Sequence, residues 1–392
     1  MINAFVNRHP VRAVALALCT LLLQGCSLFQ SDDEKALEPA ELIDFSEEME
    51  LRKVWGTSIG DGQGDDYNRL NIVVSGGRIY GAAADGTVRV VNMETGKEVW
   101  ETELDDEISG GVGYGGDLVI VGTPDGDVIA LDANSGSEVW RSKVASEVLS
   151  APGADFDVVV VYALNGQITA FDSSTGELRW RQETNMPLLT LRGGAPVLME
   201  NGNAYVALAN GRILAFKASN GTILWDGKIA QPQGQSDIER VVDIEGKPLV
   251  IGQTMYAVTY QGKLGAVSMG NGRSLWSRDA SSYMSVAEGF GNLYVAESQG
   301  AVSAFEINGG ALRWQNDQFA RRQLSAPAVF SNYVAVGDFE GYVHVLSQVD
   351  GHVVGRERVD SAGLRADMLG IGDRLYVYDN DGGLTCYEPR IR

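Results

Sequence analysis

Few side chains in this sequence are of the types that carry out catalysis, and their spacing does not fit a known chemistry. The 392-residue chain has three histidines, and His344 and His352 are the two that lie beyond the first 25 residues. They do not form the i, i+4 pair of a zinc-binding helix, and no H-E-x-x-H, G-x-S-x-G or P-loop motif occurs. We therefore expect both to be solvent-exposed or rim residues, not ligands.

Two acidic, glycine-rich stretches raise the question of calcium. They are residues 60–66 (GDGQGDD) and 378–383 (YDNDGG). Neither has the alternating carboxylates and distal glutamate of an EF-hand loop. Many further carboxylates recur at turns, but no pair stands out as a general acid and base. The sequence thus predicts solvated loops, no catalytic residue and no bound metal.

The N-terminus has the layout of a secretory signal. Two arginines precede a short apolar run, residues 13–23, which is too short to span a bilayer. The run ends in LQGC, which resembles the lipobox of bacterial lipoproteins. That resemblance implies a signal peptide at 1–25 and lipidation of Cys26. Cys386 would then have no disulfide partner, and it is expected to be a small buried residue.

Charge and composition favour attachment through a lipid. Residues 26–50 are charged and poor in β-branched residues, as a tether would be. The formal net charge of −21 becomes −23 once the two arginines of the signal are removed. Such acidity argues against nucleic acid and against electrostatic adhesion to anionic lipid. Ser27, in place of Asp, implies by the lipoprotein sorting rule a lipid-anchored protein of the outer membrane, facing the periplasm.

The rest of the chain repeats one unit of about 40 residues. In each unit, two strands with alternating apolar residues flank a turn such as TG or NG, and the second strand usually ends in Trp. Another strand and a short extended piece precede them. Four antiparallel strands per unit match a propeller blade. The copies of the core pattern are 85–100, 125–140, 165–180, 210–225, 261–276, 299–314 and 340–355, with a truncated copy at 381–392.

The two ends of the repeat region complement each other. The truncated copy ends before its last strand, whereas residues 51–59 (LRKVWGTSI) contain a Trp strand with nothing before it. Pairing the N-terminal with the C-terminal strand completes a blade and removes exposed sheet edges. Residues 51–392 are therefore predicted to be one all-β domain. The fold is an eight-bladed β-propeller of four-stranded antiparallel blades.

The repeat motif A-x-D-x-x-x-G-x-x-x-W, as at 130–140 and 170–180, resembles that of quinoprotein (PQQ-like) propellers. It lacks the Gly-His and Trp-Asp marks of WD40 repeats. PQQ enzymes carry an extra Trp beneath the cofactor, but all seven Trp here occupy the repeat position. They are expected to pack one blade on the next. No cofactor is predicted, and a periplasmic PQQ-dependent dehydrogenase is the alternative, since fold does not fix chemistry.

Three connections between repeats are longer than the others. The first, between Trp55 and Gly86, gains mostly Gly and Asp, as a flexible acidic loop would. The other two contain residues 185–196 and 234–248. Both insertions precede the innermost strand of neighbouring blades, so they should emerge on the same face. Insertions on one face of a repeat protein often form its binding surface.

The insertion at 185–196 has the composition of an interface centre. Leu188, Leu189 and Leu191 are apolar anchors beside Arg192. The alternative is that these leucines turn inward and cap the central channel.

The combination of lipobox, acidic tether and eight-unit ring resembles the BamB family. These are lipoproteins of the β-barrel assembly machinery in Gram-negative outer membranes. The match is close through LTLRG (189–193), DIERVVDIEGKP (237–248), GDFEGYVH (337–344) and VDSAG (359–363). The resemblance implies a non-enzymatic scaffold that binds the periplasmic POTRA domains of BamA. It also implies a role in inserting β-barrel proteins into the outer membrane.

The resemblance also implies which residues contact BamA. They are Leu189, Leu191 and Arg192 in the first insertion, and Asp243 and Glu245 in the second. Glu245 departs from the Asp that is usual in the family. Arg192 could instead pair with the two acids inside the molecule, which would then shape the loop rather than touch the partner. The ring could also hold unfolded outer-membrane clients at exposed strand edges.

Overall fold

The computed structural model describes residues 38–66 and 69–392. The predicted signal peptide at 1–25, the lipidation site Cys26 and the first part of the predicted tether lie outside these residues. Residues Leu42–Arg392 form one compact unit. Its regular elements are 32 strands, β1–β32. Within the described part of the chain, no helix is long and apolar enough to cross a membrane.

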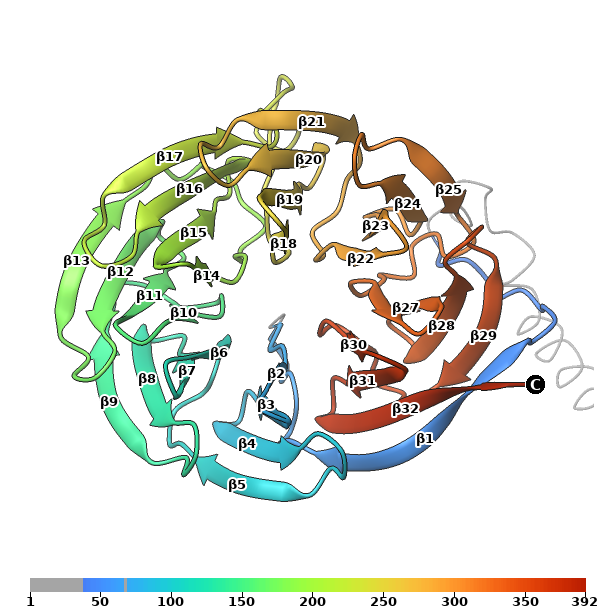
Figure 1. The fold of residues 1–392 in the computed structure, drawn as a ribbon, viewed down its shortest axis with the longest axis horizontal. Helices are drawn as coiled ribbons and strands as arrows, with labels where there is room; N and C mark the ends of the chain where they lie inside the picture. Colours follow the sequence, from blue (N-terminus) through green and yellow to red (C-terminus); the bar gives the residue numbers. More distant parts are fainter. Residues whose placement is uncertain (1–37, 67–68) are drawn as a thin grey trace, which may run out of the picture. The chain divides into compact units, whose positions relative to one another are not determined.

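The strands form eight four-stranded antiparallel sheets around a central axis (Figure 1). Blade 1 contains β2 (Val73–Ser75), β3 (Arg78–Ala82), β4 (Thr87–Asn92) and β5 (Glu98–Glu103). Blade 2 contains β6 (Gly110–Gly115), β7 (Leu118–Gly122), β8 (Asp127–Asp132) and β9 (Glu138–Lys143). Blade 3 contains β10 (Gly153–Ala154), β11 (Val158–Tyr162), β12 (Gln167–Asp172) and β13 (Leu178–Glu183). Blade 4 contains β14 (Leu198–Glu200), β15 (Asn203–Ala207), β16 (Arg212–Lys217) and β17 (Ile223–Lys228).

The second half of the ring repeats this arrangement. Blade 5 contains β18 (Leu249–Ile251), β19 (Thr254–Val258), β20 (Lys263–Ser268) and β21 (Ser274–Asp279). Blade 6 contains β22 (Ala287–Gly289), β23 (Asn292–Ala296), β24 (Val302–Glu306) and β25 (Leu312–Asn316). Blade 7 contains β26 (Ala328–Phe330), β27 (Tyr333–Gly337), β28 (Tyr342–Ser347) and β29 (Val353–Arg358). Blade 8 contains β30 (Leu369–Ile371), β31 (Arg374–Tyr378), β32 (Gly383–Ile391) and β1 (Met49–Ser58).

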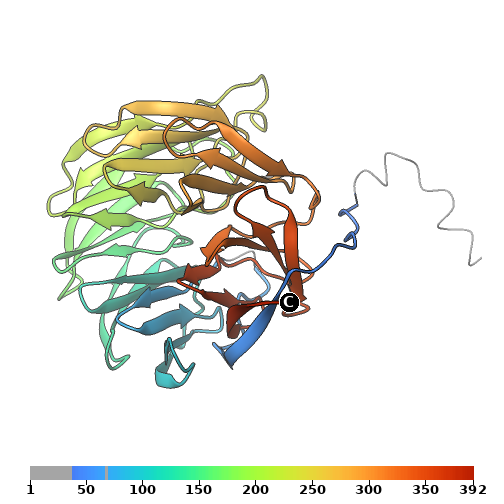
Figure 2. The same ribbon diagram turned by 45° about the vertical axis from the view of Figure 1, so that its right-hand side comes forward.

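Blade 8 closes the ring as predicted, because its outermost strand comes from the other end of the chain. β1 pairs with β32 from Met49 opposite Ile391 to Ser58 opposite Gly383 (Figure 2). Cys386 lies opposite Trp55 and is fully buried, which confirms the expectation for this cysteine. Closure does not remove every sheet edge. The outermost strand of each blade has one hydrogen-bonded neighbour, so its outer edge stays unpaired, and client binding there stays a prediction.

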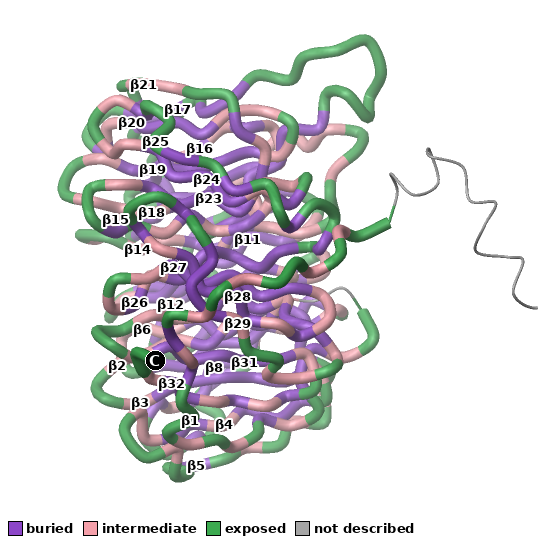
Figure 3. Tube along the Cα trace, turned by 90° about the vertical axis from the view of Figure 1, so that its right-hand side faces the viewer, coloured by how far each residue is buried: buried purple, intermediate pink, exposed green. Residues whose placement is uncertain are grey.

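Position in the blade decides how each strand is buried. In the second strand, β11, all five residues VVVVY are buried because neighbouring blades cover both faces. In the outermost strand, β9, the sequence EVWRSK buries Trp140 alone among its six residues. The buried residues therefore fill the spaces between blades, and the exposed residues lie on the turns and the outer strands (Figure 3).

The tryptophans join each blade to the next, as predicted. Trp140 of blade 2 donates its indole N–H to the carbonyl of Ser173 in blade 3 at 2.7 Å. Its ring lies against Gly176, where a Cβ would be 2.7 Å from the indole carbons. Gly176 also has a positive φ of 71°. Glycine is therefore favoured there both by the close approach of the indole and by the backbone conformation. The same indole hydrogen bond to the next blade is made by Trp55, Trp100, Trp180, Trp225, Trp276 and Trp314.

Blade 7 is the exception, and ring closure explains it. Gly355 stands at its repeat-end position. The next blade has no turn between its two outer strands, because β32 and β1 are not consecutive in the chain. No turn glycine is present to receive an indole, and Met49 of β1 packs against Gly355 instead. Blade 7 thus lacks a repeat Trp because blade 8 lacks the turn on which that Trp would pack.

The end of the predicted tether is part of the ring. β1 starts at Met49, before the predicted start of the propeller at residue 51. Ahead of it, the ring of Phe45 lies under the Arg356 guanidinium, 4.9 Å from its carbon to the ring centre. Arg356 also donates to the carbonyl of Ile43 at 3.1 Å, and Glu48 N–H donates to Val354 at 2.9 Å. Residues 43–48 therefore pack along the outer strand of blade 7.

The expectation that both acidic stretches are solvated was wrong in part: Asp61, Asp65, Asp66 and Asp381 are exposed, but other residues of the two stretches are buried. Gln63 is fully buried. Its side-chain amide donates to Leu70 O at 2.9 Å and accepts from Leu70 N–H at 2.8 Å. Its own N–H donates to Asn380 O at 3.0 Å, so stretches 60–66 and 378–383 contact each other where blades 1 and 8 meet. Gly62 packs against the Asn380 backbone, an approach that a side chain would block.

His344 was also predicted wrongly, because it is fully buried in blade 7. Arg356 donates to its Nδ1 at 3.2 Å, so Nε2 carries the proton and faces Asp338 at 2.9 Å. Arg322 donates to the same carboxylate oxygen at 2.7 Å. Burial lowers the pKa of His344, and the nearby arginines act in the same direction. His352 is exposed, as expected, and contacts Asp350 and Glu48.

The contact between Trp and glycine predicts unequal effects of two matched substitutions. Gly221 and Gly252 have positive φ values of 70° and 61°. A Cβ at Gly221 would lie 2.7 Å from the Trp180 ring, whereas one at Gly252 would meet nothing within 4 Å. In both alanine variants, backbone strain should lower the free energy of unfolding by about 1 kcal/mol. Gly221→Ala should lose about 2 kcal/mol more through overpacking. Equal urea denaturation midpoints for the two variants would contradict this assignment.

Candidate functional site: three loops at the mouth of the central channel

The two predicted insertions lie together on one face of the ring. We call residues 185–196 the leucine loop and residues 234–248 the support loop. In each blade the strands alternate in direction, so all connections from an outermost to an innermost strand emerge on the same face. The support loop projects from that face between β17 and β18 (Figure 2). The two loops meet through a hydrogen bond of 2.6 Å from Leu191 N–H to Asp243 Oδ2.

The three leucines of the leucine loop are exposed to solvent. The exposed fractions are 95% for Leu188, 42% for Leu189 and 36% for Leu191. Leu191 lies at the edge of the central cavity, whereas Leu188 projects fully into water. The alternative in which all three leucines turn inward is therefore wrong. Their apolar surface is left uncovered in the isolated chain.

Arg192 lies between these leucines and the ring but does not pair with the support loop. Its side chain is 69% exposed, and its Nη2 lies 2.6 Å from Oε2 of Glu147, which is in the connection between blades 2 and 3. The ion pair with Asp243 and Glu245 that the sequence left open does not form. Exposed pairs of this kind contribute little to stability. Arg192 can therefore exchange Glu147 for another carboxylate at small cost.

Asp243 holds the leucine loop from beneath. Its side chain is buried, with an exposed fraction of 1% for the residue. Oδ2 accepts the Leu191 N–H, and Oδ1 has no hydrogen-bond partner among the described residues. Burial raises the pKa of Asp243 to about 7; the Leu191 hydrogen bond opposes this rise and the charge of Glu245 adds to it. Burial of a carboxylate with one oxygen unpaired lowers the stability of the fold, so such a group is uncommon where it serves only to hold a loop.

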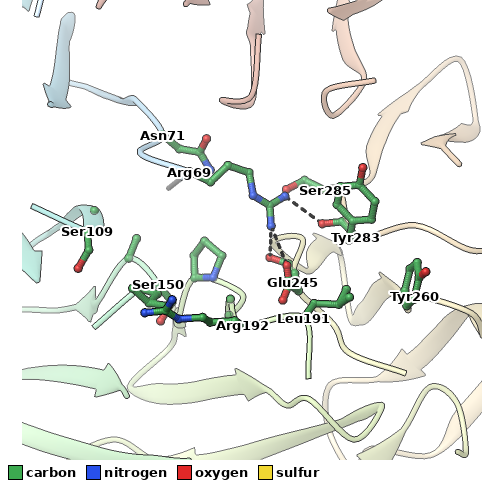
Figure 4. A pocket seen from close by; sticks show the side chains of 16 residues that line it. Arg69, Asn71, Ser109, Ser150, Leu191, Arg192, Glu245, Tyr260, Tyr283 and Ser285 are labelled. Atoms are coloured by element: carbon green, nitrogen blue, oxygen red, sulfur yellow. Dashed lines mark hydrogen bonds and ion pairs between the residues drawn. The ribbon is translucent and has the colours of Figure 1, made fainter. Parts of the chain in front are cut away.

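Glu245 is paired by an arginine that the sequence analysis did not single out. Arg69 Nη2 lies 3.5 Å from Glu245 Oε2, and Nη1 donates to the carbonyl of Tyr283 at 2.9 Å (Figure 4). Burial raises the pKa of Glu245, while the charge of Arg69 lowers it. Arg69 lies on the first long connection, residues 59–66 and 69–72, which we call the crossing loop. The sequence did contain a signal for this loop: the connection that holds Arg69 is as long as the connection that holds the leucine loop.

The three loops, together with connections of other blades, line a cavity of about 230 Å³ at the channel mouth. Its lining mixes apolar residues such as Leu191 with hydroxyls such as Tyr260 and Tyr283. In residues 38–66 and 69–392, no group of three or more His, Cys, Asp or Glu side chains is arranged to hold a metal ion. Among the charged side chains at the site, Arg69 pairs with Glu245, Arg192 pairs with Glu147, and Asp243 accepts a backbone N–H. The arrangement offers a surface for binding another molecule.

Comparison with known proteins identifies the family. A sequence profile described as outer membrane protein assembly factor BamB matches residues 84–316 and 298–391. The protein of that name from Pseudomonas aeruginosa is 58% identical over 377 residues, which cover 96% of this chain and 98% of that one. The chain belongs to the BamB family. The predicted resemblance is thereby confirmed. The relatives are named as assembly factors, in agreement with the prediction that the chain is not an enzyme.

Comparison with solved structures distinguishes relatives of the same family from proteins that share only the fold. The crystal structure of BamB from Moraxella catarrhalis superposes with a TM-score of 0.78 at 28% identity, covering 86% of this chain and 99% of that one. A europium-containing methanol dehydrogenase superposes with a TM-score of 0.69 at 15% identity, covering 85% of each chain. At that identity, the likeness to the dehydrogenase concerns the fold alone.

The raised pKa of Asp243 predicts a specific dependence of stability on pH. Between about pH 4 and 7 the folded state holds a proton that the unfolded state has released. The free energy of unfolding therefore falls as pH rises through this window, by about 1.4 kcal/mol per pH unit from this group. Asp243→Asn should remove that slope while still accepting the Leu191 N–H. Urea denaturation at several pH values would measure the difference.

The matched control is Asp237→Asn, in the same loop, where the carboxylate is exposed and pairs with Arg240. It should leave the slope of the wild type unchanged. If Asp243→Asn and the wild type gave parallel curves from pH 4 to 7, the buried carboxyl would titrate normally and the assignment would be wrong.

Proposed function

We propose that this chain is a lipid-anchored scaffold of outer-membrane β-barrel assembly that binds the periplasmic POTRA domains of BamA. Membership of the BamB family supports the role in assembly. The binding surface is the leucine loop. One observation carries this: Leu189, Leu191 and Arg192 are displayed to solvent on a backbone that the support loop holds from behind.

The proposal divides the predicted site residues into two roles. Leu189, Leu191 and Arg192 would touch BamA, since apolar anchors beside an arginine are typical of interface centres. Asp243 is buried and the Glu245 side chain is 11% exposed, so both would hold the loop and make no contact of their own. In this strongly acidic chain, Arg192 would also give the surface a cation for a carboxylate of the partner.

The anchor would be lipid on Cys26 after removal of residues 1–25. A net charge of −21 for the full chain does not favour adhesion to anionic lipid, so a hydrophobic anchor is the remaining physical means. The tether would then run from Cys26 to the segment at 43–48, which is fixed along blade 7.

Truncation of Leu191 or Arg192 should weaken BamA binding without unfolding the ring. In Leu191→Ala and Arg192→Ala, affinity for purified BamA POTRA domains should fall about 10- to 100-fold each, as at interface centres. Isothermal titration calorimetry would measure this with the full-length protein in detergent. The melting temperature should stay within about 2 °C of the wild type, because both side chains are exposed.

Two variants away from the three loops serve as matched controls. Leu312→Ala removes a leucine that is more exposed than Leu191, and Arg212→Ala removes an ion pair with Asp226. Neither should change affinity. Unchanged binding in Leu191→Ala and Arg192→Ala would place the interface elsewhere on the ring, and absence of binding in the wild type would refute the proposal.

Lipidation at Cys26 can be tested separately. Cys26→Ser should prevent both lipid attachment and the associated cleavage after residue 25. Because the uncleaved variant keeps the apolar run at 13–23, it would still partition into detergent, so mass spectrometry is the readout and should detect an uncleaved N-terminus with no acylated cysteine. A wild-type protein whose mature N-terminus carries no lipid would rule out this anchor.

A further inference from the structure

Arg69 reaches the support loop from the opposite side of the ring. It lies on the crossing loop ahead of β2 in blade 1, whereas Glu245 lies ahead of β18 in blade 5. These blades face each other across the channel (Figure 1). The Arg69 side chain extends toward blade 5, and its guanidinium contacts Glu245 and the Tyr283 carbonyl (Figure 4). Its Nη1 also lies 3.2 Å from Met284 Sδ.

From Glu245 the contact continues to the leucine loop. The Glu245 carboxylate packs against Gly193, where a Cβ would lie 2.6 Å from Oε1. On the other side of Arg192, the Leu191 N–H is held by Asp243. Two carboxylates of the support loop thus hold the residues that flank Arg192.

The backbone between these two points needs to be held. Arg192 has a φ of 57°, in the left-handed region that a residue with a Cβ seldom adopts. Such a conformation persists when the surroundings fix it. The flanking contacts at Leu191 and Gly193 supply that restraint, and they turn the Arg192 side chain outward.

The position of Glu245 depends in turn on a cation. Its side chain is 11% exposed, and a buried carboxylate without a counter-charge either takes up a proton or moves toward water. Arg69 supplies the counter-charge and is itself fixed by the Tyr283 carbonyl. Loss of Arg69 would therefore release the carboxylate from Gly193.

We propose that Arg69 is a positioning residue for the BamA-binding surface, acting across the channel through Glu245 to hold the turn that displays Leu191 and Arg192. This rests on the proposed function for the identity of the partner. Arg69, which is 17% exposed, does not itself contact BamA in this scheme. The crossing, support and leucine loops act as one unit, so the surface is intact only when the ring is closed.

The test uses the full-length protein with Arg69→Met, Glu245→Gln and the double variant. Hydrogen exchange of the peptide containing Leu191, without partner, reports how well the turn is held. Each single variant should exchange that amide about tenfold faster and bind BamA POTRA domains about tenfold more weakly. The double variant should be no worse than either single one, because both act in one chain of contacts.

A merely structural role of Arg69 would give another pattern. It would lower the melting temperature and leave the exchange of Leu191 unchanged, or it would add to the effect of Glu245→Gln. Either result would overturn the proposal. Arg212→Met, which removes an ion pair between β16 and β17, is the matched control and should change neither readout. If Arg69→Met does not fold, Arg69→Lys should show a smaller increase in exchange, and wild-type exchange in it would also overturn the proposal.

The two readouts separate this proposal from the proposed function. Faster exchange in Arg69→Met together with no POTRA binding by the wild type would support the positioning role and refute the partner. Normal binding in Arg69→Met despite faster exchange would refute the link between the turn and recognition.

Discussion

The contact between an indole and a glycine turn is the interaction on which the ring depends. Each Trp of an outermost strand packs on the turn of the next blade and donates a hydrogen bond to it, as Trp140 does at Gly176 and Ser173. The contact sets the spacing of neighbouring blades. Where the chain ends replace the turn, Met49 packs on Gly355 and continues the contact between blades.

A closed ring brings loops together that are far apart in sequence. Since all connections from outermost to innermost strands emerge on one face, those of opposite blades approach each other over the channel. Arg69 meets Glu245 in this way, and Asp243 meets Leu191. The molecule keeps carboxylates of the support loop buried, at a cost in stability. In return the turn at Arg192 is held in a conformation that it would not adopt alone.

The same frame serves other chemistry in the methanol dehydrogenase whose fold it shares. In this chain, the groups that meet at the channel mouth are engaged with one another: Arg69 with Glu245, and Asp243 with a backbone N–H. These contacts fix the shape of the surface at the channel mouth. The two proteins share the blades, and their functions differ through the loops, whose sequences the repeat motif does not specify.

The sequence by itself determined the repeat, the eight blades, the pairing of β1 with β32, the packing of the tryptophans and the shared face of the two insertions. These follow from local periodicity and from the order of strands, which a single chain displays directly. Tertiary structure alone decided the burial of His344 and Gln63, the pairing of Arg192 with Glu147 and the reach of Arg69 to Glu245. The contacts of Gln63, Arg192 and Arg69 depend on distances between different blades or their connections, and the burial of His344 depends on how the residues of blade 7 fold around it. No spacing along the chain encodes those distances, because they are set only when the ring closes.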